Sequence, residues 1–102
     1  MAEFQVDNNG SLSRFEVNID DESAYLKYVL GKNTISLPHT FTPESLRERG
    51  IASTVTRFAL DYAKEKRLQV IAGCSFVALY VQQHPEYEPL LLKQTVREYF
   101  IN

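Results

Sequence analysis

Alternating apolar and polar residues over the first forty positions of the chain predict strands that each bury one face. The predicted strands cover residues 4–6, 15–19, 24–30 and 34–42. Asn8-Asn9-Gly10 separates the first two, and Asn-Gly is a strong hairpin signal because both residues tolerate positive φ. The first part of the chain is therefore expected to form a four-stranded antiparallel meander without a helix.

Pro38 interrupts the fourth predicted strand, on which Ile35, Leu37, His39 and Phe41 are expected to share one face. Proline cannot donate a backbone hydrogen bond, so the sequence predicts a bulge or an unpaired edge at this position. Two interpretations remain open. The proline opens the sheet just before the loop that follows, or it occupies a free edge with no further role.

A change of periodicity after Gly50 predicts a helix that ends near Lys66-Arg67. The turn Thr42-Pro43-Glu44-Ser45 precedes it. Its apolar face is expected to hold Ile51, Val55, Phe58, Ala59 and Tyr62. A helix N-terminus carries unpaired N–H groups and a partial positive charge, and here Arg47, Arg49 and Gly50 adjoin it. Such an end is suited to holding phosphate oxygens.

The second half of the chain continues with a strand and a shorter helix. Residues 68–73 read as a short buried strand, parallel to the fourth because a helical crossover separates the two. Ser75 is the expected N-cap of a helix over residues 76–83, which stops at His84-Pro85. Residues 90–92 are expected to pack, and residues 95–100 form either a short helix or a terminal strand.

Composition narrows the class of protein. A chain of 102 residues with 44% apolar and 24% charged residues is expected to form one globular domain over residues 1–102. Its net charge of −2 gives no general attraction to nucleic acid or to an anionic membrane. The single cysteine, the lack of a long apolar run and the polar N-terminus predict a cytoplasmic protein.

Four short motifs resemble those of a known family. Arg47-x-x-Gly50-x-Ala52 is similar to the Gln/Arg-x-x-Gly-x-Gly/Ala loop of the GNAT superfamily of acyl-CoA-dependent acetyltransferases. The other three motifs resemble a short GNAT-like family that is little more than the cofactor-binding half of that fold, and they are Leu37-x-His39-Thr40, Cys74-x-Phe76-Val77 and His84-Pro85-Glu86-Tyr87. The resemblance covers roughly residues 12–90. It implies an α/β fold with a mixed, mostly antiparallel sheet of about five strands and two main helices.

The resemblance also implies acetyl-CoA as the ligand. In GNAT proteins the backbone amides of this loop hold the pyrophosphate, and the pantetheine arm lies between the splayed fourth and fifth strands. The expected cofactor-binding residues are Phe41, Thr42, Arg47, Arg49, Gly50, Ile51, Ala52 and Ser53. One departure is Glu48, where relatives often carry glycine, because a carboxylate repels phosphate unless it points to solvent or pairs with an arginine.

Cys74 is the first candidate for chemistry. It ends the fifth predicted strand and precedes a helix, where the positive end of the helix dipole favours a thiolate. The resemblance implies that this cysteine lies in the active site. It then either accepts the acetyl group as a thioester or lines the site while transfer is direct. The alternative is a small buried apolar residue, the usual fate of a free cysteine.

His39 and Tyr80 are the other catalytic candidates. An imidazole at His39 can take a proton from Cys74 or from the acceptor amine, or it is a structural histidine of the core. Tyr80 matches the tyrosine of the second GNAT helix, which can protonate the departing CoA thiolate. It lies nearly two helical turns beyond Cys74, so the direction of its side chain decides whether it reaches the active site. His84 and Tyr87 are expected to be structural.

Three functions from different classes are compatible with these residues. The first is an acyltransferase that moves acetyl from acetyl-CoA to an unidentified amine. The second is a CoA-binding or protein-interaction module without efficient catalysis, suggested because the N-terminal helices that shape the acceptor site of GNAT enzymes are not recognisable. The third, a nucleotide- or nucleic-acid-binding module, is disfavoured by the net charge and by the lack of a basic surface studded with aromatic residues.

Overall fold

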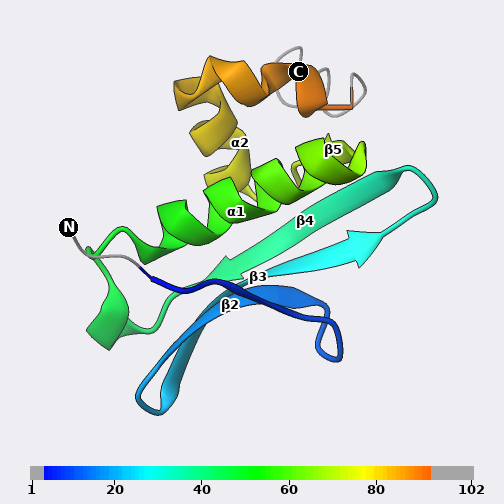
Figure 1. The fold of residues 1–102 in the computed structure, drawn as a ribbon. Coiled ribbons are helices and arrows are strands. Elements are labelled where there is room, and N and C mark those ends of the chain that lie inside the picture. Colours follow the sequence, from blue (N-terminus) through cyan, green and yellow to red (C-terminus); the bar gives the residue numbers. More distant parts are fainter. Residues whose placement is uncertain (1–3, 93–102) are drawn as a thin grey trace.

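A computed structural model describes residues 4–92 of the chain and shows one five-stranded sheet in the order β1-β2-β3-β4-β5 (Figure 1). The strands are β1 (Asp7–Asn9), β2 (Arg14–Ile19), β3 (Glu22–Leu30), β4 (Thr34–Phe41) and β5 (Gln69–Ile71). Neighbouring strands are antiparallel except β4 and β5, which are parallel. The predicted mixed, mostly antiparallel sheet is confirmed.

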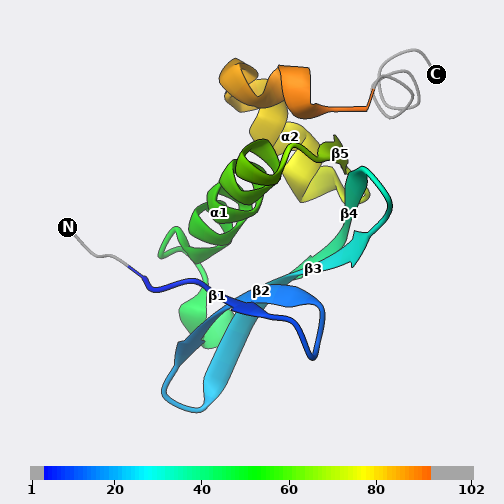
Figure 2. The same cartoon turned by 45° about the vertical axis from the view of Figure 1, so that its right-hand side comes forward.

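Two main helices accompany the sheet, as predicted. The helices are α1 (Ile51–Lys66) and α2 (Ser75–Gln83), with short 3₁₀ turns at η1 (Glu44–Leu46) and η2 (Pro85–Leu90). The long helix α1 lies across one face of the sheet, and α2 and η2 pack against α1 at the β5 end (Figures 1 and 2). No helix among residues 4–92 is long and apolar enough to cross a bilayer.

The core lies between α1 and the sheet. Strand residues Phe15, Leu26 and Ile35 are fully buried, and Ile51 and Ala59 of α1 meet them. Each large side chain buried in this way stabilises the fold by about 1.5–3 kcal/mol relative to exposure. The rest of the predicted α1 face is divided between the core and its margin. Val55 is buried, whereas Phe58 and Tyr62 are partly exposed and place their rings edge-on against Phe15.

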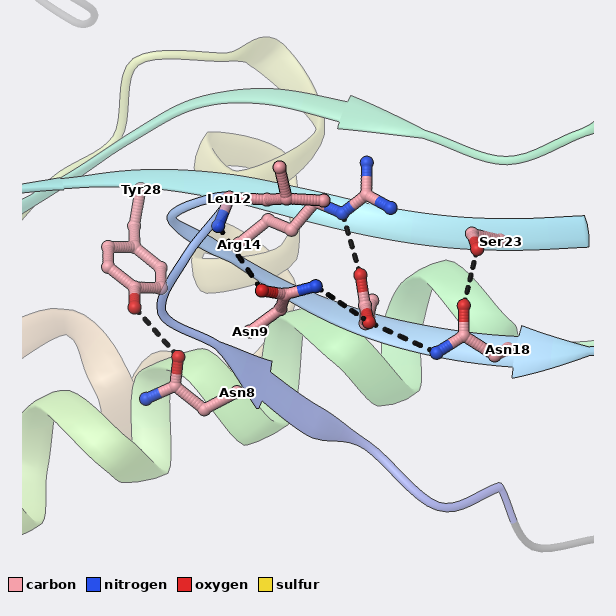
Figure 3. A network of polar contacts seen from close by, with 8 residues as sticks. Asn8, Asn9, Leu12, Arg14, Asn18, Ser23 and Tyr28 are labelled. Atoms are coloured by element: carbon pink, nitrogen blue, oxygen red, sulfur yellow. Dashed lines mark hydrogen bonds and ion pairs between the residues drawn. The ribbon is translucent and has the colours of Figure 1, made fainter.

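The first hairpin differs from the prediction. Asn8 and Asn9 lie inside β1, paired with Phe15 and Arg14, and the turn falls over residues 10–13. The positive φ belongs to Ser13, at 53°. Side-chain hydrogen bonds hold both asparagines in the strand: Tyr28 Oη donates to Asn8 Oδ1 at 2.7 Å, and Asn9 Nδ2 donates to Glu16 at 3.1 Å (Figure 3). The Asn-Gly hairpin signal does not take such bonds into account.

Pro38 lies in a bulge of β4, as predicted, and not on a free edge, because β4 runs between β3 and β5. Lys27 pairs with His39, but Val29 pairs with Ser36, which leaves Leu37 and Pro38 together opposite Tyr28. The extra residue reverses the alternation of side chains along the strand. The expectation that residues 35, 37, 39 and 41 share one face is therefore wrong. Ile35 and Leu37 are buried, whereas His39 and Phe41 are exposed.

The predicted crossover from β4 through α1 to β5 is confirmed, but the start of α2 is one residue off. Cys74, and not Ser75, is the N-cap, with extended φ and ψ of −126° and 154°, and Ser75 is the first helical residue. The helix ends before Pro85, as expected. Leu90 and Leu91 pack on the core, and Leu92 N–H donates to the Val70 carbonyl at 2.9 Å. The prediction for residues 95–100 lies outside the described residues.

Candidate functional site

The N-terminus of α1 is uncapped. Gly50 is its N-cap residue, with a left-handed φ of 78° that favours glycine, and it offers no side chain to the helix. Thr54 N–H donates to the Gly50 carbonyl at 3.0 Å. Ile51, Ala52 and Ser53 occupy the first turn, whose N–H groups have no carbonyl one turn earlier in the helix to bind. No acidic residue lies in this turn, so the end is free to receive an anion.

A surface depression of ≈ 230 Å³ opens at this helix end. Six of the predicted cofactor-binding residues line it, namely Thr42, Arg47, Gly50, Ile51, Ala52 and Ser53. Leu46, Glu48 and Phe76 complete the lining, so the depression reaches from the loop before α1 to the first turn of α2. Arg49 is exposed beside it without lining it, and Phe41 belongs to the end of β4.

The loop before α1 is tied to β4 by one of the predicted arginines. Arg47 Nε donates to the Thr42 carbonyl at 3.1 Å, and Arg47 N–H donates to the Glu44 carbonyl at 3.2 Å. Glu48 follows with a left-handed φ of 64°, a conformation that costs a residue with a side chain about 1–2 kcal/mol. This backbone explains why glycine suits the position, and it makes Glu48 a strained residue in the lining of the depression.

The strands β4 and β5 diverge immediately beyond Pro38. Their last backbone contact is the bond from Gly73 N–H to the Leu37 carbonyl, at 3.1 Å. A Cβ on Gly73 would stand 2.9 Å from Pro38 Cα, so only glycine allows this approach. Beyond it β4 continues to Phe41, while the segment that follows β5 turns away into α2. The sheet therefore opens into a gap at this point.

Backbone groups of Thr40 face this gap. Tyr28 N–H donates toward β2, to the Ser13 carbonyl at 2.9 Å, so by alternation Lys27 and Tyr25 turn their backbone groups toward β4. They pair with His39 and Phe41, whose backbone groups are thereby used. Thr40 lies between these two and turns its N–H and carbonyl to the other side. The backbone groups of Phe41, a predicted cofactor-binding residue, are therefore used within the sheet, and those of Thr40 face the gap.

Cys74 lies at the same gap. Its Sγ is 3.8 Å from Thr40 Oγ1, and its side chain is half-buried at the start of α2. The Cys74 carbonyl accepts a bond from Ala78 N–H at 3.2 Å, which fixes the residue to the helix. Thr42 and Phe76 line the depression, and each is two residues from this contact. The depression thus comes within two residues of the thiol along both segments, although neither Thr40 nor Cys74 lines it.

His39 is not brought to Cys74. Thr40 pairs with the buried Leu26 and projects to the α1 face, so its neighbour His39 projects to the opposite face beside Lys27. The nearest ring there is that of Tyr25, at 6.3 Å between centroids. The bulge at Pro38 causes this placement. Of the two predicted proton sources for His39, only an acceptor amine that approaches on this face fits the geometry.

Tyr80 packs away from the thiol. Six residues along α2 correspond to about 9 Å of rise and about 120° of rotation from Cys74. Its ring stacks on His84 at 4.0 Å, and His84 Nδ1 bonds to the Tyr80 carbonyl at 2.9 Å. Burial raises the pKa of the Tyr80 phenol, partly offset by Arg57 and reinforced by Asp61 and Glu86. The contacts of Tyr80 are packing contacts, and its role as a proton donor stays a prediction.

Phe76 is a lining residue that the sequence argument missed. It is 36% exposed on the first turn of α2 and forms one wall of the depression opposite the α1 loop. The motif Cys74-x-Phe76-Val77 does not reveal this role, since exposure on a helix cannot be read from so short a pattern.

No metal site is formed among residues 4–92, because no three His, Cys, Asp or Glu side chains there are grouped so that they could hold a metal ion.

This fold, with an uncapped helix end beside two splayed parallel strands, is that of a GNAT domain. The sequence profile of the GCN5-related N-acetyltransferase family matches residues 14–90, and the chain belongs to this family. Among named relatives, the chain is similar to protein NATD1 of Gallus gallus, 31% identical over 84 residues, which cover 79% of this chain and 76% of the relative. NATD1 of Xenopus tropicalis is 29% identical over 87 residues, covering 82% and 80%.

A solved structure shares the fold. The solution structure of a GCN5-like protein from Staphylococcus aureus superimposes with a TM-score of 0.69 and 22% sequence identity, covering 90% of this chain and 91% of that one. At this level of sequence identity, the structural likeness shows the fold alone.

Proposed function

We propose that the protein transfers the acetyl group of acetyl-CoA to a primary amine, with Cys74 as the transient carrier of the acetyl group. The observation that supports this most is the contact of the half-buried Cys74 sulfur with Thr40, at the place where β4 and β5 separate. The uncapped helix N-terminus and its depression lie nearby, since Thr42 and Phe76 of the lining are each two residues from this contact. Membership of the GCN5-related family supports acetyl transfer in general.

The residues at the start of α1 fit a diphosphate. The N–H groups of Ile51, Ala52 and Ser53 supply directed donors, and Arg47 and Arg49 supply positive charge. Phe76 offers an apolar surface between the loop and the gap. Thr40 offers one backbone donor and one acceptor to an amide lying in the gap, as a missing strand would do. The bound thioester supplies an activated acetyl group.

Cys74 accepts the acetyl group in the first step. Its thiolate attacks the thioester carbonyl, a new S–C bond forms, and the S–C bond to CoA breaks, so that CoA leaves as a thiolate and takes up a proton. Cys74 is the N-cap residue of α2, so its sulfur lies at the positive end of the helix dipole. The Thr40 hydroxyl, 3.8 Å from the sulfur, holds the side chain against β4.

The acceptor amine completes the reaction. Its nitrogen attacks the acetyl carbon, an N–C bond forms, the S–C bond to Cys74 breaks, and the thiolate of Cys74 is restored. The proton released by the nitrogen goes to His39, which is exposed one residue from Thr40 and projects to the opposite face of β4. An amine approaching on that face therefore meets a base on its own side of the sheet.

Mass spectrometry of the protein after incubation with acetyl-CoA tests this proposal. We expect one acetyl group on a peptide that contains Cys74, removed when an amine is added, and no adduct on Cys74→Ala. The Cys74→Ala protein still binds the donor, and saturation at about a hundred times Kd stabilises it by about 2.7 kcal/mol. For a domain of this size, that raises Tm by about 10 °C or more.

The same experiment separates the alternatives. A rise in Tm without an adduct or turnover of any amine supports a CoA-binding module instead. Turnover that survives in Cys74→Ala shows direct transfer and contradicts the carrier role. Unchanged Tm at saturating acetyl-CoA contradicts the proposal as a whole.

A further inference from the structure

The face of β2, β3 and β4 that points away from α1 carries chemistry that the donor site does not use. Because the bulge reverses the alternation of β4, His39 and Phe41 project to this face beside Tyr25 and Lys27 of β3. Lys27 and His39 are exposed, Phe41 is 41% exposed, and Tyr25 is half-buried. We call these four residues the open-face cluster.

Two aromatic rings of the open-face cluster form a platform. The centroids of Tyr25 and Phe41 are 5.4 Å apart with an interplanar angle of 35°. These residues are directly paired across β3 and β4, so their Cβ atoms lie about 5 Å apart on the same face. Exposed rings in such an arrangement suit the apolar body of a small molecule.

Arg14 and Lys27 both carry a positive charge near this platform, but the charge of Arg14 is compensated. Arg14 lies 4.3 Å from the Tyr25 ring centroid, but its Nε forms an ion pair with Glu16 Oε1 at 2.7 Å. Burial raises the pKa of Glu16, yet hydrogen bonds from Asn18, Arg14 and Asn9 outweigh it, so the net pKa is lowered and the carboxylate stays charged (Figure 3). Arg14 is thereby neutralised.

Lys27 differs from Arg14 in this respect. Within the part of the chain that the structure describes, Lys27 forms no ion pair. It is paired directly with His39, so the two side chains lie on the same face about 5 Å apart at Cβ. The open-face cluster thus places an ammonium and an imidazole next to an apolar platform.

We infer that the open-face cluster binds the acetyl acceptor, and that this acceptor is a primary amine with an apolar body and a carboxylate of its own. Lys27 pairs with the carboxylate, Tyr25 and Phe41 contact the body, and His39 receives the proton of the amine. The cluster and the Thr40–Cys74 contact lie on opposite faces of β4, so the amine reaches the acetyl group on Cys74 through the gap beyond Pro38. A diamine is disfavoured because its second ammonium would face Lys27. This inference rests on the proposed acetyl transfer.

Three probes of equal length test the acceptor class: aminohexanoate, hexylamine and diaminohexane. Each is titrated into the isotope-labelled protein without CoA, and chemical shifts of the open-face cluster are followed. We expect saturable shifts with aminohexanoate at an affinity at least tenfold above that of diaminohexane. Each probe is also added to protein acetylated on Cys74, where aminohexanoate should remove the acetyl group fastest.

Charge reversal provides the matched control. In Lys27→Glu we expect the order to invert, with diaminohexane now binding better than aminohexanoate, while Lys32→Glu, an exposed lysine of the β3–β4 turn, keeps the original order. An unchanged preference in Lys27→Glu overturns the inference. So do shifts confined to the groove lined by Ala78, Val81 and Leu91, or a concentration-dependent mass showing that a second copy covers the face.

The binding titration does not depend on donor chemistry. If Cys74 is never acetylated but aminohexanoate binds the open-face cluster, the proposed carrier step fails and the acceptor site stands. If Cys74 is acetylated and no probe shifts the resonances of the open-face cluster, the carrier step stands and the acceptor inference fails.

Discussion

Gly73 lies so close to Pro38 that a Cβ added to Gly73 would stand 2.9 Å from the Cα of Pro38 and 3.3 Å from the Leu37 carbonyl oxygen. Both obstacles belong to the backbone, which cannot rotate away. This contact is the hinge point at which β4 and β5 separate, so it fixes where the gap begins.

Gly73→Ala is expected to force β4 and β5 apart. Overpacking against a rigid neighbour costs about 1–3 kcal/mol, so the free energy of unfolding should fall by that amount in urea titrations. Gly10→Ala is the control, because a Cβ at Gly10 meets nothing within 4 Å. Equal stability of the two variants would contradict the close approach of the strands.

Thr40→Val removes a hydroxyl at 3.8 Å from the Cys74 sulfur and keeps the shape of the side chain. If the hydroxyl holds the thiol in place, acetylation of Cys74 should slow by about three- to tenfold, the effect of one net hydrogen bond. Thr40→Ser should retain the wild-type rate. Binding of CoA, measured by calorimetry, should stay unchanged in both, and a loss of binding in Thr40→Val would assign the residue to folding instead.

Glu48 combines a left-handed backbone with a carboxylate at the rim of the depression. Glu48→Gly should raise the free energy of unfolding by about 0.5–1 kcal/mol, because glycine adopts φ of 64° without steric cost. It should also tighten CoA binding by removing a like charge. Glu48→Gln separates the two effects, since it removes the charge and keeps the strain. Stability gained in Glu48→Gln but not in Glu48→Gly would refute the backbone argument.

Tyr87 links η2 to α1 through a bond from its phenol to Asp61 Oδ1 at 2.8 Å. Burial, and then the bond and charge of Asp61, raise the pKa of Tyr87 to about 12. A group whose folded pKa is raised stabilises the fold fully below its unfolded pKa of about 10, and this contribution is lost as pH rises toward 12. Tyr87→Phe should cost about 1 kcal/mol at neutral pH and abolish that part of the alkaline loss of stability.

The sequence predicted the elements that are set by local chemistry. Alternation identified three of the four antiparallel strands closely, and helical spacing identified α1 and α2, because these patterns are imposed by burial alone. Pro38 predicted a bulge or an unpaired edge, and the structure has the bulge. What the pattern could not show was which way the strand turns after that bulge, since one extra residue exchanges the two faces. Thr40, and not the predicted His39, therefore lies beside Cys74.

The placement of side chains relative to one another depended on contacts between distant segments. Thr40 and Cys74 are 34 residues apart, and no local signal marks their approach. The N-cap is Cys74 and not the predicted Ser75, and it makes no side-chain hydrogen bond to the helix, so the cap preference of serine did not set where α2 starts. Asn8 and Asn9 entered β1 through bonds to Tyr28 and Glu16, partners that lie on other strands.

In the proposed reaction, amides at the start of α1 hold the diphosphate of a donor whose thioester reaches Cys74. An NMR titration with CoA tests it most directly through the amide resonances of Ile51, Ala52 and Ser53 and the β-carbon of Cys74. The account predicts that these resonances shift together with a single dissociation constant. Saturable binding that leaves them in place, with shifts elsewhere, would contradict it.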